Sequence, residues 1–181
     1  MARISIPARD DSPAASQPIL DASKRQLGFI PNSFRVMGIS TPVLQGYAGL
    51  GQALNKTLDA RTRDGIALAV SDVNDCDYCV TAHGYIAAHF SKSPPEEILR
   101  NREGHSSDPK RDAAVHFAKR LVETRGNVDG EDLDAVRKAG FDDKQIIEIV
   151  AVAVHALMTN FMNNVAQPEI DFPAISPSQA A

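Results

Sequence analysis

The stretch "DARTRDGIALAVSDVNDCDYCVTAHGYIAAHF", residues 59–90, carries the residue spacing on which the fold assignment depends. A helix is predicted to begin at Asp59, because an aspartate at a helix start accepts hydrogen bonds from unpaired backbone N–H groups. Its apolar residues recur on one side, at Ile66, Val70 and Val73. A second helix is expected to begin between Asn74 and Asp77. Its inward face carries residues at helical spacing, namely Cys79, His83, Ile86 and Phe90.

The rest of the chain also favours helices over strands. Helix starts are indicated at Thr41, Asp108 and Asp142, where a capping residue or a proline precedes an apolar pattern of helical period. Residues 146–162 are apolar around most of the helix circumference. This predicts a helix that is covered on both faces, either at the centre of the fold or at an oligomer interface. Because no segment alternates apolar and polar residues as a strand would, the sequence predicts an all-α fold.

Length and composition predict one compact domain with short flanking segments. A chain of 181 residues with 43% hydrophobic residues can build one sizeable core. Residues 1–18 are expected to form a flexible arm, residues 19–165 the helical domain, and residues 166–181 an extended tail. The formal charge of −4 and the scattered basic residues disfavour nucleic acid as a partner. Without a long uninterrupted apolar run or an apolar leader, no membrane contact and a cytosolic location are expected.

Cys76 and Cys79 are the two cysteines of the sequence, and His83 follows Cys79 by about one helical turn. In a reducing compartment a close cysteine pair is more often catalytic or metal-binding than a permanent cross-link. A separation of three residues at a helix start lets two sulfurs form and break a disulfide. The helix start and a nearby histidine favour a reactive thiolate, whereas Asp75 and Asp77 oppose it. Redox chemistry is favoured, and a metal site or inert packing are the alternatives.

Two observations bear on these alternatives. A structural zinc site needs four ligands, and Cys76, Cys79 and His83 supply only three, so Asp64 or water would have to complete it. A thioredoxin-like motif belongs to a βαβ unit, and no such pattern is present. No metal or other cofactor is therefore expected.

Asp64 is the candidate acid beside the cysteine helix. It shares a helix face with Ala67 and Leu68, which places its carboxylate on a partly buried surface. There it could orient His83 or relay a proton. The alternative is a surface ion pair with Arg61.

Other polar residues in apolar surroundings are given structural roles. His155 interrupts an apolar run and lies on a similar helix face to Glu148, so these two residues are expected to pair with each other or with a partner chain. Lining of the active pocket is the alternative for this pair. Tyr78 is expected to pack rather than to act as an acid. The end of the same helix is expected to be capped or cross-linked by its asparagines, Asn160, Asn163 and Asn164.

The segment "RTRDGIALAVSDVNDCDYCVTAHGYIAAH" resembles the AhpD-like alkylhydroperoxidase and carboxymuconolactone decarboxylase superfamily, in its peroxidase-related branch. A second segment, "LGFIPNSFRVMGISTPVLQGY" at residues 27–47, resembles the proline-containing N-terminal part of that branch. The resemblance extends over roughly residues 20–171. It implies an all-helical AhpD-like domain that oligomerises through its helices and reduces organic hydroperoxides with thiols.

The resemblance also implies roles for individual residues. Cys79 matches the cysteine that becomes a sulfenic acid, and Cys76 matches the cysteine that resolves it as a disulfide. His83 matches the relay histidine, and Asp64 falls where the superfamily has a relay glutamate. An aspartate is one methylene shorter, which withdraws the carboxylate by ~1.5 Å. Tyr78 stands where the alkylhydroperoxidase itself has a histidine.

The function expected from the sequence is thus a thiol-dependent peroxidase that acts through the CxxC pair. Its reductant is expected to be an external dithiol, of the dihydrolipoyl type that the resemblance suggests, and the chain is expected to form a homo-oligomer. Two alternatives stay open. One is a lyase that acts on a small lactone acid, as the other superfamily name suggests, and the other is a non-enzymatic helical module for assembly or metal binding.

Overall fold

A computed structural model describes residues 2–173, and this part of the chain contains helices and no strand. In these residues a short 3₁₀ helix precedes the α-helices in the order η1 (Arg9–Asp11), α1 (Gln17–Leu27), α2 (Asn32–Gly38), α3 (Thr41–Leu54), α4 (Ala60–Val73), α5 (Asp77–His89), α6 (Pro95–Glu103), α7 (Pro109–Glu123), α8 (Gly130–Lys138) and α9 (Asp143–Ala166). The predicted all-α fold is confirmed.

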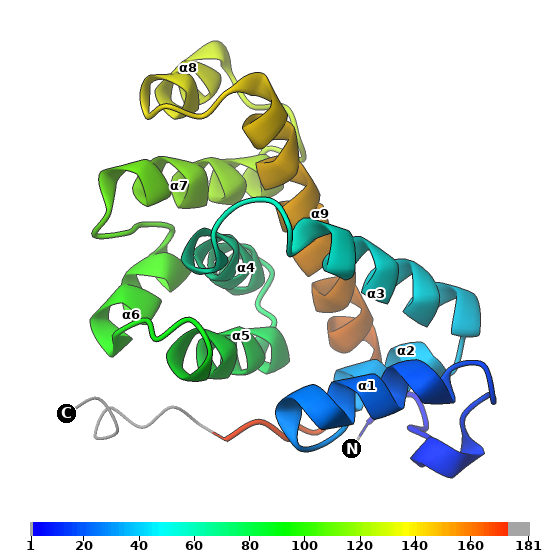
Figure 1. Cartoon of the computed structure of the whole chain (residues 1–181). Helices are drawn as coiled ribbons and strands as arrows, with labels where there is room; N and C mark the ends of the chain where they lie inside the picture. Colours follow the sequence, from blue (N-terminus) through cyan, green and yellow to red (C-terminus); the bar gives the residue numbers. More distant parts are fainter. Residues whose placement is uncertain (1, 174–181) are drawn as a thin grey trace.

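Helix α4 lies at the centre of the structure, with α5, α6, α7 and α9 packed around it (Figure 1). Every residue from Gly65 to Ser71 is buried, so this helix is covered on all sides. Gly65 allows the close approach of α7, because a Cβ atom at this position would lie 2.8 Å from the Val115 side chain. The main aliphatic core forms where α4, α7 and α9 meet.

Helix α9 is covered on one face only. Its buried side contributes Ile149, Val152 and Ala156 to the aliphatic core. The opposite side leaves large apolar residues exposed, namely Ile147, Val154, Phe161 and Val165. Of the two predicted positions, a single chain thus covers only one face of α9, and burial of the other face at an oligomer interface stays a prediction. Among the described residues, only α9 is long and apolar enough to cross a membrane, a test that core helices also pass.

The helix starts predicted from capping residues are confirmed. Asp59 accepts a hydrogen bond of 3.1 Å from the backbone N–H of Thr62 and begins α4. Asp142 accepts one of 2.8 Å from Gln145 N, and the Gln145 side chain in turn accepts from Asp142 N, which completes a capping box at the start of α9. These contacts are local in sequence, and this is why spacing alone reveals them.

The segments that flank the helical body lie against it. The Arg9 guanidinium donates to Asp21 of α1, and Arg35 Nε of α2 donates to the carbonyl oxygen of Pro7 at 2.8 Å. The flexibility predicted for residues 1–18 stays a prediction, but these contacts place residues 7–9 on the helices. After α9, residues 168–173 have no regular secondary structure, and this segment bonds to α2 and α5 through Asn32 and Tyr78. The remainder of the predicted tail, residues 174–181, lies outside the described residues.

Candidate active site

The two cysteines lie at the start of α5 and are joined as a disulfide. Cys76 is the residue that caps the helix, and its Cα atom lies 5.3 Å from that of Cys79 in the first turn. Asp75 turns the chain out of α4 with a left-handed backbone, at a φ of 49°. The Cys76 N–H then donates to the Ser71 carbonyl at 3.0 Å. A helix start between Asn74 and Asp77 and a pair of sulfurs that can meet are both as predicted.

Both cysteines are almost completely covered, with 1% of Cys76 and 2% of Cys79 exposed. They pack in an apolar cluster with side chains from the residues before α2, from α5 and from the end of the chain, namely Leu27, Phe29, Tyr78, Ala82, Tyr85 and Phe172. The Phe172 ring contacts three other rings, with centroid distances of 5.1 Å to Phe29, 5.9 Å to Tyr78 and 5.7 Å to Tyr85. The disulfide therefore lies under an aromatic roof, which we define as Phe29, Tyr78, Tyr85 and Phe172.

The part of the roof that carries Phe172 is a segment without regular secondary structure, held by a few polar contacts. The Asp171 carboxylate accepts a hydrogen bond of 2.7 Å from the Tyr78 hydroxyl and one of 2.8 Å from the Asn32 N–H. The Asn32 side chain donates to the Glu169 carbonyl at 3.0 Å. We call residues 168–172 the strap. Burial raises the pKa of Tyr78 well above its ordinary value, so its hydroxyl stays protonated and donates to Asp171.

The polar group that contacts a cysteine sulfur is Asn163 of α9. Its Nδ2 donates to Cys79 Sγ at 3.2 Å, and the side chain is buried. Two neighbouring asparagines also contact the end of α4: Asn160 donates to Ser71 Oγ at 3.1 Å, and Asn164 donates to the Asn74 carbonyl at 2.7 Å. Cross-linking by these asparagines is as predicted. The contact of Asn163 with the sulfur was not predicted, although three asparagines at the end of an apolar helix are an unusual signal.

His83 lies one turn beyond Cys79 on α5, in a half-buried position. Burial, followed by the charge of the nearby His155, lowers the pKa of His83 to about 4. Its imidazole is therefore neutral at pH 7. Within residues 2–173, no hydrogen bond joins His83 to either cysteine in this oxidised form.

The predicted pair of His155 and Glu148 is wrong. His155 Nε2 donates to the Tyr47 carbonyl at 3.0 Å, and its ring stacks on that of Tyr47 at a centroid distance of 4.0 Å. Glu148 instead pairs with Lys144, one turn earlier on α9, at 3.7 Å. Spacing along one helix cannot reveal a partner such as Tyr47 on α3.

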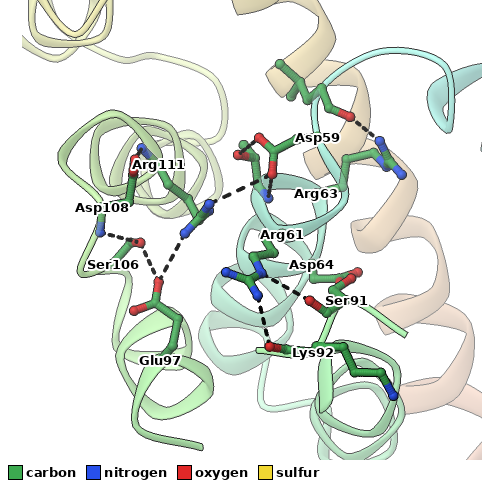
Figure 2. Close-up of polar contacts among 12 residues, drawn as sticks. Asp59, Arg61, Arg63, Asp64, Ser91, Lys92, Glu97, Ser106, Asp108 and Arg111 are labelled. Atoms are coloured by element: carbon green, nitrogen blue, oxygen red, sulfur yellow. Dashed lines mark hydrogen bonds and ion pairs between the residues drawn. The ribbon is translucent and has the colours of Figure 1, made fainter. Parts of the chain in front are cut away.

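Asp64 lies toward the opposite end of α4 from the disulfide, where its carboxylate accepts a hydrogen bond from the Ser91 hydroxyl (Figure 2). Burial raises the pKa of Asp64, and the hydrogen bond from Ser91 opposes this shift. Arg61 donates to the carbonyl oxygens of Ser91 and Lys92, at 3.0 Å each. The alternative ion pair between Arg61 and Asp64 is thus wrong, and no direct hydrogen bond links Asp64 to His83 in the described part of the chain.

A second polar cluster lies at the start of α4 (Figure 2). Glu97 of α6 is buried and accepts hydrogen bonds from the Ser106 hydroxyl and the Ser107 N–H. The guanidinium of Arg111, on α7, lies 3.6 Å from Glu97 and 3.9 Å from Asp59. Among residues 2–173, no group of three or more His, Cys, Asp and Glu side chains is arranged to hold a metal ion.

Comparison with known proteins gives a match to one family model and to several solved structures. Residues 42–120 match the Carboxymuconolactone decarboxylase family. An uncharacterized protein of Haemophilus influenzae is 40% identical over 63 residues, which cover 33% of this chain and 56% of that relative. The chain thus matches little more than half of that relative's length.

The solved structures agree with the observed fold. An uncharacterized peroxidase-related protein of Ralstonia eutropha JMP134, described as an alkylhydroperoxidase AhpD core, has a TM-score of 0.83 at 24% identity, over 94% of this chain and 92% of that one. A peroxidase-related protein of Silicibacter sp. TM1040 has a TM-score of 0.79 at 23% identity, over 92% and 90% of the two chains. A cysteine-to-alanine variant of the debrominase Bmp8, in complex with 2,3,4-tribromopyrrole, has a TM-score of 0.80 at 21% identity, over 94% of each chain.

These structures share the helical arrangement of this chain, and the matched family model spans both α4 and α5. Residues 42–120 thus match the Carboxymuconolactone decarboxylase family, and the chain as a whole has the fold of the AhpD-like peroxidase-related structures.

Proposed function

We propose that the chain is a thiol oxidoreductase that reduces organic hydroperoxides through Cys79 and Cys76. The observation that carries this proposal is a buried cysteine pair, joined as a disulfide at a helix start, with a side-chain donor on the sulfur of Cys79. An inert packing pair would not require a buried polar partner, because an amide costs free energy to bury unless it makes a hydrogen bond.

The reaction has three steps. The Cys79 thiolate attacks the terminal oxygen of the hydroperoxide, so an S–O bond forms, the O–O bond breaks, and the alkoxide leaves and is protonated to an alcohol. Cys76 then attacks the sulfenic acid sulfur, which forms the disulfide and releases water. An external dithiol reduces the disulfide by exchange and is itself oxidised to a disulfide.

The surrounding residues supply hydrogen bonds and a proton acceptor. Asn163 would stabilise the Cys79 thiolate by donating to sulfur, as it donates to the disulfide sulfur in this structure. His83, neutral at pH 7, would accept a hydrogen bond from the Cys79 thiol and pass its proton on toward the leaving alkoxide, because with a pKa of about 4 the imidazole does not hold the proton itself. The resemblance gives Asp64 a relay role, but its carboxylate is bonded to Ser91, and the proposed steps do not require it.

The reductant would be a dithiol such as a dihydrolipoyl group in the reducing cytosol. A slender dithiol suits a disulfide with so little exposed surface, because only a small group can reach it once the roof opens. Thiol–disulfide exchange also favours a dithiol, because the second thiol of the reductant resolves the mixed disulfide and completes the reduction.

The test is mass mapping of the peptide that contains both cysteines. The chain is fully reduced, exposed to one equivalent of an organic hydroperoxide, and digested with and without prior alkylation. We expect the peptide to lose two hydrogens and to resist alkylation, together with one equivalent of alcohol formed. Two thiols that stay free to alkylate would exclude this function.

A second candidate is a lyase that acts on a small lactone acid, which is favoured by the family model over residues 42–120. That chemistry needs no thiol pair. A variant with both cysteines replaced by serine would then keep its activity on the lactone, whereas the thiol mechanism requires that all peroxide reduction is lost.

We also propose that the chain assembles with copies of itself through α9. Its exposed face carries Ile147, Val154, Phe161 and Val165, of which Val165 is 61% exposed. Burial of such a stripe stabilises association by about 25 cal/mol per Å² of apolar surface. Light scattering should show an oligomer for the natural chain and a smaller species for Phe161→Asp.

A further inference from the structure

The surroundings of the disulfide are unusually rich in aromatic side chains. The sequence contains seven phenylalanines and three tyrosines, and four of these ten rings form the roof over Cys76 and Cys79. Aliphatic residues dominate the main core between α4, α7 and α9. The roof is therefore a local feature of the cysteine site and is not typical of the whole interior.

The four rings differ in how firmly they are held. Tyr78 and Tyr85 lie on α5, whose backbone is fixed by helical hydrogen bonds, and Phe29 lies in the short connection between α1 and α2. Phe172 lies on the strap, which has no regular secondary structure and is held through Glu169 and Asp171. Phe172 is thus carried by a segment outside the helices, and three hydrogen bonds from Asn32 and Tyr78 hold that segment in place.

Displacement of Phe172 would have two consequences. The disulfide sulfurs would lose part of their cover, which substrate access requires because the two cysteines are now 1% and 2% exposed. The space vacated would be lined by three rings, each of which now packs against Phe172 at 5.1–5.9 Å, two of them edge to face. A planar aromatic group would restore these contacts, whereas a branched aliphatic group would not.

We propose that this space is the hydroperoxide-binding site. It binds a hydroperoxide that carries an aromatic ring, and this ring occupies the position of Phe172. The peroxide group would then lie beside Cys79. The reduction of this hydroperoxide rests on the proposed thiol peroxidase function. The recognition of its aromatic ring does not, because it depends on the three rings alone.

Binding without chemistry is the first test. The probes are 2-phenyl-2-propanol and tert-butanol, the alcohols left by an aromatic and an aliphatic hydroperoxide, titrated by NMR into the oxidised chain. In Phe172→Ala the competing ring is removed, so we expect 2-phenyl-2-propanol to bind about tenfold more tightly than to the natural chain, and tert-butanol to change by less than about threefold. Ile170→Ala is the matched control, since Ile170 lies on the same strap and is 43% exposed. Equal binding of the phenyl alcohol to the natural and Phe172→Ala chains would overturn the proposal.

Steady-state kinetics are the second test. We expect kcat/KM to be at least about tenfold higher for cumene hydroperoxide than for tert-butyl hydroperoxide, and Phe29→Leu to lower this ratio several-fold, because one wall of the site is lost. A ratio that Phe29→Leu leaves unchanged would contradict the aromatic site. If neither peroxide is reduced while Phe172→Ala still binds the phenyl alcohol more tightly, the peroxidase function fails and the aromatic site stands.

Discussion

The two ends of helix α4 are held by different kinds of polar contact. At its C-terminal end, the side chains that face the disulfide are neutral: Asn160 on Ser71, Asn164 on Asn74, and Asn163 on Cys79. The ion pair of this end, Asp72 with Arg102, instead joins α4 to α6. At its N-terminal end the groups are charged, and Asp59, Arg111 and Glu97 join α4, α7 and α6 (Figure 2). The contacts of α4 beside the disulfide thus form a neutral network, whereas those at its N-terminal end form an ionic one.

The difference follows from what each end must hold. A carboxylate beside Cys79 would raise the pKa of its thiol, whereas an amide N–H donates to thiolate, sulfenate or disulfide sulfur without adding net charge. At the other end the pKa values of Asp59 and Glu97 are lowered, so both carboxylates stay ionised near neutral pH and complementary charges can join the helices. Buried charge is tolerated there because Glu97 has several donors. Each of the following predictions tests one side of this comparison.

The largest effect is expected from the cysteines. Cys79→Ser should reduce peroxide turnover by more than about a thousandfold, because no thiolate is left to attack. Cys76→Ser should instead react once and stop at the sulfenic acid, which a dimedone adduct detected by mass spectrometry would reveal. If the dimedone adduct formed in Cys79→Ser instead, the two cysteine roles would be reversed.

The ionic end should matter most for stability. Burial alone would raise the pKa of Glu97, but hydrogen bonds from Ser106 and Ser107 and the charge of Arg111 outweigh it, so the pKa is lowered on folding. Glu97→Gln should lower the free energy of unfolding by about 2 kcal/mol, because a charged acceptor of several hydrogen bonds is lost. Urea unfolding at pH 7 measures this change.

The pH dependence of the same variant gives an independent check. The pKa of the Glu97 carboxyl is lower in the folded chain than in the unfolded chain, where it is about 4.3. Its contribution to the free energy of unfolding is therefore complete above the unfolded pKa and is lost as the pH falls through the folded pKa. As the pH is lowered below about 5, the free energy of unfolding should therefore decrease in the natural chain, and it should decrease less steeply in Glu97→Gln. Glu103→Gln, an exposed position on the same helix, is the control and should follow the natural chain.

The neutral end should act on reactivity. Asn163→Leu removes the donor to Cys79 Sγ, which should raise the pKa of the Cys79 thiol by about one unit and slow its reaction with peroxide at pH 7 about tenfold. Thiolate absorbance, titrated in a Cys76→Ser background, reports the pKa of Cys79 alone. Asn164→Leu is the matched control, because its amide contacts the Asn74 carbonyl and no sulfur. Equal thiol pKa values in the two variants would remove Asn163 from the proposed mechanism.

The sequence predicts those features whose cause is local. Asp59 and Asp142 bond within their own first turns, so residue type and spacing reveal the helix starts. The position of Cys76 at the start of α5 follows from the same kind of pattern. The spacing of the two cysteines alone is compatible with redox chemistry, metal binding or packing. The resemblance is what assigns a specific redox reaction to the pair.

The features that the sequence does not reveal depend on residues brought together from distant parts of the chain. Asn163 lies 84 residues from Cys79, and Asp171 lies 93 residues from Tyr78. The extended tail predicted after residue 165 carries no periodic pattern, so nothing in it marks Phe172 as a cover for the disulfide. The sequence also leaves open whether α9 is covered by this chain or by a partner, since an apolar surface does not identify the chain that buries it.

The smallest effect on peroxide turnover is expected from Asp64. The resemblance gives this residue a relay role, whereas the structure bonds its carboxylate to Ser91. Asp64→Asn keeps an acceptor for the Ser91 hydroxyl, and the carboxylate has no direct bond to His83 in the described residues, so kcat/KM for peroxide should change by less than about threefold. A relay acid would instead be worth ~10²–10⁴ in rate. Ser91→Ala separates the two roles, because it removes the partner of Asp64 without removing the carboxylate. A hundredfold loss of kcat/KM in Asp64→Asn, with Ser91→Ala near the natural rate, would show that a charge on the N-terminal half of α4 assists the reaction of the cysteines. The division between a neutral reactive end and an ionic structural end would then no longer hold.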